Sequence, residues 1–261
     1  MPRIKRRLDP DQKNMTALHS LSHRVDCNAC PIRHRAVCAK CETDELEQLN
    51  RIKFYKTFTA GQVIAIRGEQ LDIVASIVAG TASLTRSIND GRVQMIGLLL
   101  PSDFIGRPGR EAAPYDITAI TDVTLCCFHK RPFERLLLEM PHVGERLLEM
   151  SLDELDAARD WMLLLGRKTA RERIASLLAL ILKRANLPMD LQGEGCQIDL
   201  PITREMMANF LGLTIETVSR QLTGLAKDGI IEIEGKRGIH VPDLSALLAE
   251  TGDDTDGGVD Y

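Results

Sequence analysis

The sequence predicts an α+β protein: an N-terminal antiparallel β-roll, then one long helix, then a C-terminal winged helix-turn-helix. Three observations carry this prediction. Short β-type runs separated by glycine and polar turns occupy residues 52–130, which favours an antiparallel roll. Apolar residues recur at helical spacing through residues 132–185. Residues 203–241 then read as helix, tight turn, helix and β-hairpin.

Composition narrows the class of protein. The chain has 261 residues, enough for two domains, and 44% hydrophobic residues, enough for a packed core. It has no apolar stretch of about 18 residues and no apolar segment behind its basic N-terminus. We therefore expect no membrane span, no secretory signal and a cytoplasmic location. The net charge of −4 argues weakly against nucleic-acid binding, but the charges are unevenly spread and say little about any one face.

Changes of character along the chain divide it into five parts. They are an arm with a cysteine segment at 1–45, a sensor roll at 46–139, a dimerisation helix at 140–168, a winged helix-turn-helix at 169–248, and an acidic, disordered tail at 249–261.

Local signals place the elements of the first half. A short helix is expected at 43–51, capped by Thr43, with Leu46 and Leu49 facing inward. The β-type runs are QVIAIRG, IVASIVAGTASLTRS, VQMIGLLL and YDITAITDVTLCCF. The turn Asn89-Asp90-Gly91 between two of these runs predicts a hairpin.

Two prolines open helices in the middle of the chain. Pro132 and Pro141 suit the first turn of a helix, and the second helix is the longer. A 3-4-3-4 spacing keeps one seam of that helix on a single face. The seam residues are Leu148, Ser151, Leu155, Ala158, Met162 and Leu165. Spacing alone gives equal weight to a homodimer seam and to packing on the chain's own domain. The acidic flanks of the seam would repel in a parallel pair and leave a finely balanced dimer.

Residues 203–231 have the layout of a helix-turn-helix. Thr203 caps a first helix, Gly212 breaks it, and Thr214 caps a second. The start of such a second helix enters the major groove of double-stranded DNA. Its predicted DNA-contacting residues are Thr214, Glu216, Thr217, Ser219 and Arg220. A helical hairpin with a solvated face is disfavoured, because caps, glycine turn, polar face and a basic wing occur together.

The side chains of this segment match base and phosphate chemistry. Arg220 can fork onto guanine O6 and N7, Glu216 can accept from a cytosine amino group, and Ser219 can contact a base edge. A strand pair at 231–233 and 239–241 supplies a wing. Its tip residues, Lys236 and Arg237, suit contacts to phosphates.

Seven cysteines in a chain without a signal peptide indicate metal ligands or redox groups rather than disulfides. Four of them form the pattern C-x2-C-x7-C-x2-C: Cys27, Cys30, Cys38 and Cys41. Two interpretations stay open on spacing alone, a zinc site made of all four and an iron–sulfur cluster that takes a thiolate from elsewhere. A thiol oxidoreductase is disfavoured, because such enzymes place CxxC at a helix start in an α/β fold. We expect no enzyme.

The remaining candidate ligands are ranked by their surroundings. Cys126 and Cys127 lie on a predicted strand at 123–128, where neighbours face opposite sides. Only one can point toward the arm, and the other is a small buried hydrophobe. Cys196 is placed in a loop and treated as incidental. His23 and His34 are interpreted as solvated loop histidines rather than ligands.

An N-terminal cysteine arm, a β-roll with a long helix and a winged helix-turn-helix together resemble the FNR branch of the CRP/FNR family. The specific segments are CNACPIRHRAVC, LLPSDFIGRPG, MLLLGRKTARERIASLL and GLTIETVSR, and the resemblance covers nearly all of residues 27–241. The sequence is similar above all to the FnrN/FnrL-type oxygen-responsive regulators, whose third cysteine follows a seven-residue gap. The resemblance implies that the roll is a jelly roll of the cyclic-nucleotide-binding type.

The resemblance also implies an oxygen-labile [4Fe–4S] cluster. Its ligands carry over onto Cys27, Cys30, Cys38 and Cys126. Cys126 matches the family position better than Cys127, which remains a spare candidate. Cys41 has no counterpart in the family's minimal pattern, so it is either a spare thiol or a reason to keep the zinc interpretation.

Further expectations follow from the family. The segment GRPGREAAPYDITA lacks the phosphate clamp of cyclic-AMP-binding members, so no cyclic nucleotide is expected. Glu216, Ser219 and Arg220 match the FNR pattern, which implies palindromic TTGA-type sites. Membership of the family implies RNA polymerase as a partner, for activation or repression. In the implied switch, an intact cluster orders the arm, the seams of two chains pair, and the dimer binds DNA. Oxygen destroys the cluster and so ends DNA binding. A zinc-containing regulator and a nitric oxide sensor are the alternatives.

Overall fold

The computed structural model describes residues 26–184 and 195–253 of the chain. Its elements, in chain order, are η1 (Cys27–Ala29), α2 (Thr43–Ile52), β1 (Lys53–Phe58), β2 (Val63–Ala65), β3 (Ile73–Ala79), β4 (Ala82–Ser87), β5 (Val93–Leu99), β6 (Phe104–Ile105), β7 (Asp116–Ala119), β8 (Val123–His129), α3 (Lys130–Glu139), α4 (Pro141–Arg167), α5 (Ala170–Arg184), β9 (Cys196–Asp199), α6 (Arg204–Leu211), α7 (Ile215–Lys227), β10 (Glu232–Glu234), β11 (Gly238–Val241) and α8 (Leu244–Ala249). Residues 1–25 of the flexible arm that the sequence predicts at 1–26, and the end of the tail, lie outside the described residues. None of the described helices is long and apolar enough to cross a membrane.

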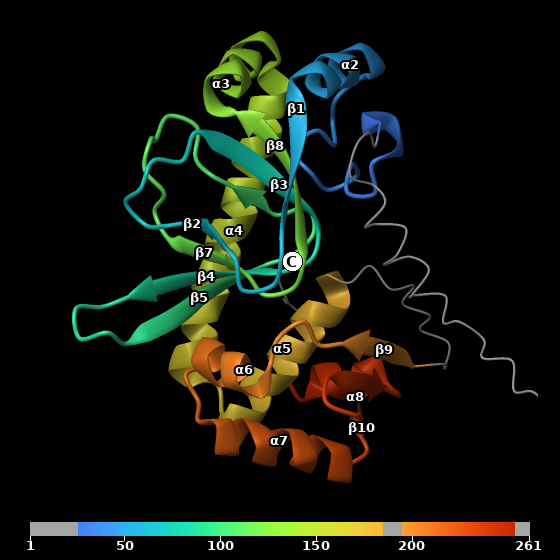
Figure 1. The fold of residues 1–261 in the computed structure, drawn as a ribbon. Helices are drawn as coiled ribbons and strands as arrows, with labels where there is room; N and C mark the ends of the chain where they lie inside the picture. Colours follow the sequence, from blue (N-terminus) through green and yellow to red (C-terminus); the bar gives the residue numbers. More distant parts are fainter. Residues whose placement is uncertain (1–25, 185–194, 254–261) are drawn as a thin grey trace, which may run out of the picture.

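Two four-stranded antiparallel sheets form the predicted roll (Figure 1). Their strand orders are β1-β8-β3-β6 and β2-β7-β4-β5, and the core between them is aliphatic and includes Ile77 and Leu125. The predicted hairpin is confirmed, since β4 and β5 pair with Ser87 opposite Val93. Strands β1 and β6 were not predicted: β1 mixes lysine with aromatic residues, and β6 is only two residues long.

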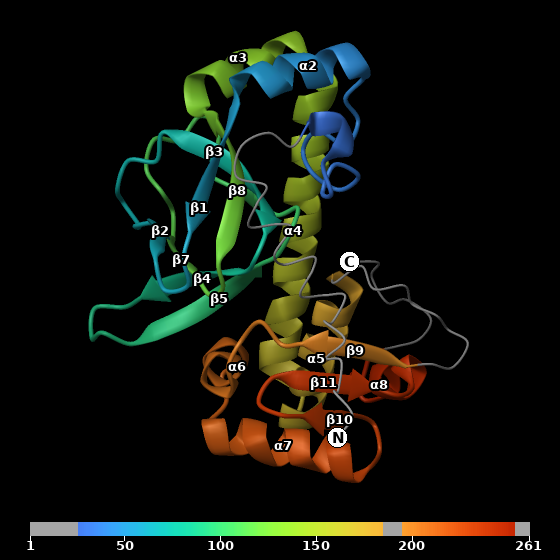
Figure 2. The same ribbon diagram turned by 45° about the vertical axis from the view of Figure 1, so that its right-hand side comes forward.

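Helices α2 and α3 cover one end of the roll, and α4 runs from that end to the C-terminal part of the chain (Figure 2). Leu46 and Leu49 are buried, as predicted, and Pro141 opens α4, as predicted. The predicted cap of α2 is wrong. Glu42 is the cap, because its carboxylate and that of Glu45 accept each other's backbone N–H groups in a reciprocal capping box.

The C-terminal part is a winged helix-turn-helix, in which α5, α6, α7 and α8 pack around a sheet of order β10-β11-β9. The loop placement of Cys196 is wrong. Cys196 opens β9, where it pairs with Val241 of β11 and is buried together with Ile198. The four-residue strand escaped prediction because the glycines just before it in the sequence, at 193 and 195, favour a loop there.

The predicted disordered tail starts too early. Glu250 forms an ion pair with Arg171, and Asp253 with Lys168. Thr251 between them is buried. The acidic residues at the start of the tail therefore hold it against α5, and the stretch 249–253 belongs to the folded domain.

The β4–β5 hairpin contacts the helix-turn-helix around Asn209 of α6, whose backbone carbonyl also accepts from the Gln94 side chain at 2.6 Å. Asn209 of α6 accepts from the Met95 backbone N–H at 2.7 Å and donates to the Val93 carbonyl at 3.3 Å. Met95 itself is buried in the hydrophobic core of the C-terminal part. Roll and DNA-binding domain thus share both hydrogen bonds and apolar packing.

We predict that Asn209→Ala loosens this junction. Loss of the two hydrogen bonds should cost about 1–2 kcal/mol locally, since the Met95 N–H loses its acceptor. Amide hydrogen exchange at Met95 should therefore speed up by about tenfold. Arg86→Ala, at an exposed position of β4, is the control. Unchanged exchange in Asn209→Ala would show that apolar packing and the Gln94 hydrogen bond to the residue 209 carbonyl hold the hairpin without the Asn209 side chain.

Candidate cysteine site and nucleic-acid interface

Strand β8 presents its two cysteines to opposite sides, as predicted. Cys127 is fully buried in the core of the roll, and burial raises its pKa to about 11. Cys126 faces outward instead and packs with Ile32 and Ala36 of the arm. The sequence-based preference for Cys126 therefore agrees with the side of the sheet on which each thiol lies.

The arm brings three further cysteines to the same place. Tight turns between residues 27 and 41 fold the segment back on itself, and Ile32 anchors it to the roll. Burial, followed by the neighbouring Cys30 and Cys27, raises the pKa of Cys38 to about 11. The pKa of Cys126 is also raised, by burial and then, after an opposing effect of Lys53, by Cys30, Cys27 and Cys38. Cys27, Cys30, Cys38 and Cys126 thus lie within electrostatic range of one another.

The floor of this site is formed by three neighbouring strands. Tyr55 of β1 and Ser76 of β3 both lie opposite Cys126 in register, so the three side chains share one face of the sheet. Lys53, two residues before Tyr55, donates to the Cys27 Sγ at 3.3 Å. The hydroxyl of Ser76 is buried and has no hydrogen-bond partner among the described residues.

These floor residues were missed at the sequence level. Lys53 and Tyr55 belong to β1, the strand that was not predicted. The alternation of KFYKTF is the signal that would have placed both on one face. Ser76 gives no such signal, because only the register with β8 shows which cysteine it faces.

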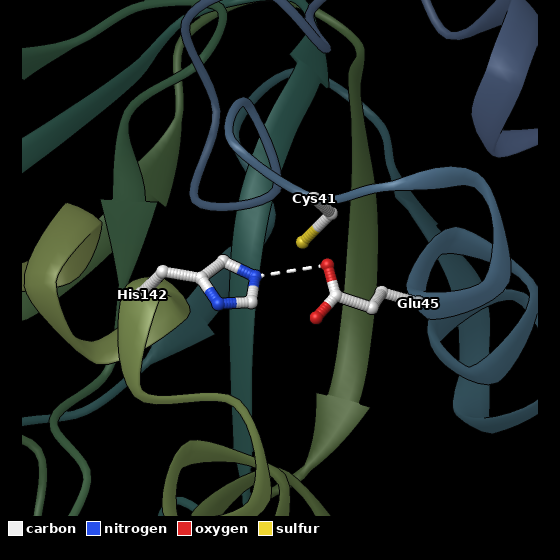
Figure 3. A group of neighbouring side chains, drawn as sticks. All are labelled: Cys41, Glu45 and His142. Carbon is white, nitrogen blue, oxygen red and sulfur yellow. Dashed lines mark hydrogen bonds and ion pairs between the residues drawn. The ribbon is translucent and has the colours of Figure 1, made fainter.

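Cys41 closes the cysteine segment and has a different set of close ligand-type neighbours from the other arm cysteines. Its thiol is beside Glu45 of α2 and His142 of α4, and the three ligand atoms lie within 4.8 Å of one another (Figure 3). In the part of the chain that the structure describes, no other group of three or more such ligand atoms is as close. The spacing therefore does not bring Cys41 into a compact four-cysteine site.

Polar contacts join the cysteine segment to α4, beside which it lies in Figure 2. Lys40 forms an ion pair with Glu149. Arg146 donates to the Arg35 carbonyl at 3.0 Å and also binds Glu149 at 3.2 Å. These contacts fall within one turn of Leu148, the first residue of the predicted seam. A change in the arm would therefore reach the helix where the seam begins.

The predicted seam is largely uncovered in the single chain. Leu148 is 60% exposed, Leu155 45% and Met162 74%, and Ser151 and Ala158 are exposed as well. Leu165 differs, because it is half-buried against the core of the DNA-binding domain.

Two features of the seam were not anticipated. Leu152 and Leu163 widen the exposed apolar face. Asp156 pairs with Arg159 on its own chain, and Glu149 pairs with Lys40, so two of the flanking acids are partly neutralised. The repulsion expected across a parallel pair is correspondingly smaller.

The predicted reading helix is built as the sequence indicates. Thr214 caps α7 by accepting from the Thr217 N–H at 3.2 Å, and Gly212 ends α6 with a φ of 63°. Its inward side chains are buried: Val218, Leu222 and Leu225. This arrangement fixes the rotation of α7 about its axis and leaves the opposite face free.

The outward face of α7 carries the predicted base-reading groups. Glu216 and Arg220 are exposed, and Arg220 donates to the Thr217 hydroxyl at 3.3 Å. The pKa of Glu216 is lowered by its own backbone N–H, by the Thr214 hydroxyl and by the Arg220 guanidinium. Ser219 is half-buried beside them. The wing turn between β10 and β11 exposes Lys236 and Arg237.

Comparisons with known proteins agree with this architecture. Residues 55–140 match the cyclic nucleotide-binding domain family, and residues 172–250 match the Crp-like helix-turn-helix domain family. The transcriptional activator protein FnrL of Cereibacter sphaeroides is 58% identical over 92% of this chain and 96% of its own length. A probable transcriptional activator of Rhizobium leguminosarum is 41% identical over 85% of this chain and 92% of its own.

A solved structure extends the likeness to three dimensions. FixK2 from Bradyrhizobium japonicum is 29% identical, covers 78% of this chain and 100% of its own, and superposes with a TM-score of 0.70. Two sheets closed into a roll, one long helix and a winged helix-turn-helix are thus shared with relatives that match over most of their length. The chain therefore belongs to the FNR branch of the CRP/FNR family of DNA-binding transcription regulators.

Proposed function

We propose that the protein is an oxygen-responsive transcription activator that binds palindromic TTGA-type DNA as a homodimer. In this proposal a [4Fe–4S] cluster is held by Cys27, Cys30, Cys38 and Cys126. The observation that carries it is the convergence of three arm thiols on the one β8 thiol that faces the arm.

The residues present fit such a group. Burial raises the pKa values of Cys30, Cys38 and Cys126 and keeps these thiols protonated when nothing is bound, so their thiolate forms need positive charge nearby, which iron ions supply. Lys53 and the unpartnered Ser76 hydroxyl offer donors to sulfur at the floor. No three of the four sulfurs lie within 4.8 Å of one another, which favours a cluster with several irons over one zinc ion. When bound, the cluster supplies the reactivity toward oxygen.

The chain's own contacts couple this site to dimerisation. An ordered arm holds Lys40 against Glu149 and the Arg35 carbonyl against Arg146. These contacts fix the start of the exposed seam, so arm order favours the paired state of α4. Two α7 helices then face successive major grooves of one DNA duplex.

The proposed partners are DNA and RNA polymerase, without a cyclic nucleotide. Relatives described as transcriptional activators support the polymerase. A hollow of about 220 Å³ in the roll is lined by apolar residues, Gln70 and Glu69. Among the described residues, its lining includes no lysine or arginine that could bind a phosphate, which disfavours a nucleotide there.

We predict that Arg220→Ala weakens binding to a TTGA palindrome by about 1–3 kcal/mol, or about 5- to 150-fold, because one bidentate base contact is lost. Discrimination against a changed guanine position should fall with it. Lys236→Ala, the matched control, should weaken all sequences alike and reduce the salt dependence. Fluorescence anisotropy without oxygen measures both. The Arg220→Ala variant should bind duplexes with the original and the changed guanine position equally well. If it still discriminates between them as the original chain does, Arg220 does not read that base.

The switch itself is tested by the same titration before and after exposure to air. We expect tight binding without oxygen and a loss of at least about tenfold afterwards, with iron lost in parallel. Binding that is equal in both samples would contradict oxygen control and leave DNA recognition in place.

A further inference from the structure

Beyond the proposed cluster, a second group of metal-ligating side chains lies between the arm and α4. Cys41 closes the cysteine segment, Glu45 lies in the first turn of α2, and His142 lies in the first turn of α4. Their ligand atoms are all within 4.8 Å of one another. Figure 3 shows the thiol, the carboxylate and the imidazole converging on one point. We propose that Cys41, Glu45 and His142 form a zinc site that is separate from the four-cysteine site.

The donor set selects the ion. A thiolate, an imidazole and a carboxylate together suit zinc, whereas calcium and magnesium require oxygen ligands only. Three protein ligands leave a fourth tetrahedral position for water. With Cys41 and Glu45 ionised and His142 neutral, the ligands carry two negative charges, which a divalent ion balances.

The geometry is close to what coordination requires. His142 Nε2 and Glu45 Oε2 are 2.9 Å apart and share one hydrogen bond, so the ring nitrogen and the carboxylate oxygen already face each other. Around tetrahedral zinc, ligand atoms lie about 3.5 Å apart, given bonds of about 2.0–2.3 Å. Replacing the shared proton by an ion therefore needs shifts of about 1 Å. Cys41 is 4% exposed and packs against the α2, α3 and α4 core, which limits the movement of its thiol.

Zinc binding at this site displaces the proton of the Cys41 thiol. Without metal, burial and then the neighbouring Cys38 and Glu45 raise the pKa of Cys41 to about 12, so the thiol is neutral. Coordination releases that proton to solvent, shifts the Nε2 proton of the neutral His142 ring to Nδ1, and forms the zinc–sulfur and zinc–nitrogen bonds, with no change of oxidation state. Arg33, which donates to the Cys41 carbonyl at 3.2 Å, favours the thiolate. The ion would tie the end of the cysteine segment to the start of the dimer helix.

Zinc K-edge absorption spectroscopy on the anaerobically purified full chain, given one equivalent of zinc, tests the proposal. We expect one sulfur and about three nitrogen or oxygen neighbours. Four sulfur neighbours would overturn it, because the ion would then sit on the other cysteines. The result is separate from the proposed oxygen switch, since iron is measured at its own edge.

Variants keep the test independent of folding defects. His142→Gln should weaken cobalt binding, used as a spectroscopic probe, by at least about tenfold. Cys41→Ser should remove the sulfur-to-cobalt absorption. His34→Gln, at an exposed histidine of the arm, is the control and should bind as the original chain does. Cobalt affinity and absorption unchanged in both His142→Gln and Cys41→Ser would overturn the site.

Discussion

Cys126→Ser is expected to abolish the iron–sulfur cluster and with it DNA binding in the absence of oxygen. Cys126 is the β8 thiol that faces the arm, and its charge interacts with those of Cys27, Cys30 and Cys38. Serine fits the same space but does not supply the thiolate that iron requires. Iron and sulfide should fall from about four each per chain to near zero.

The neighbouring cysteine is the matched control for this experiment. Cys127→Ser changes the same atom one residue along β8, but the side chain lies in the core of the roll. It should keep the cluster and lose about 1–3 kcal/mol of stability, because a buried hydroxyl replaces a thiol. Loss of iron in Cys127→Ser but not in Cys126→Ser would reverse the ligand assignment. Retention in both variants of one zinc ion with four sulfur neighbours, without iron or sulfide, would favour the four-cysteine zinc interpretation instead.

Leu155→Glu is expected to prevent dimerisation. Leu155 lies mid-seam, 45% exposed, and in a symmetric pair the substitution is present twice. Each copy loses an apolar contact of about 1.5–3 kcal/mol and adds a charge to an already acidic helix. The dimer dissociation constant should therefore rise by at least about 100-fold.

Sedimentation of the cluster-loaded chain without oxygen measures this change. Leu138→Glu on α3 is the control, since that leucine is 83% exposed and lies outside α4. A monomer for Leu155→Glu and a dimer for Leu138→Glu is the expected pair of results. A stable dimer in both variants would place the interface elsewhere and remove α4 from the switch.

The fold was accessible from sequence because its signals are local. Glycine turns, Pro141 at the start of α4 and the caps at Thr203 and Thr214 each act within a few residues. The expected helix start at Pro132 is late, because α3 begins at Lys130. That only one of Cys126 and Cys127 can face the arm also had a local basis, since strand neighbours face opposite sides. The preference for Cys126 came from the family resemblance. Sequence reasoning could not decide from the strand alone which side faces the arm, because that depends on packing of segments about ninety residues apart.

The parts that sequence missed are set by long-range packing. Ser76 reaches the cysteine site only through the register of β3 with β8, and Lys53 only through the pairing of β1. Cys41 meets His142 because α2 and the start of α4 pack together at one end of the roll. Leu152 and Leu163 were left out because a 3-4 spacing selects one line of residues, whereas the exposed face of α4 is wider.

The most direct test is a metal and sulfide assay on protein purified without oxygen, read together with DNA binding before and after air. Before exposure to air we predict about four irons and four sulfides per chain, together with DNA binding. Exposure to air should remove the iron, the sulfide and the DNA binding. One further zinc per chain that survives air would agree with a separate site at Cys41. Zinc without sulfide, with DNA binding unchanged by air, would contradict the oxygen-sensing account.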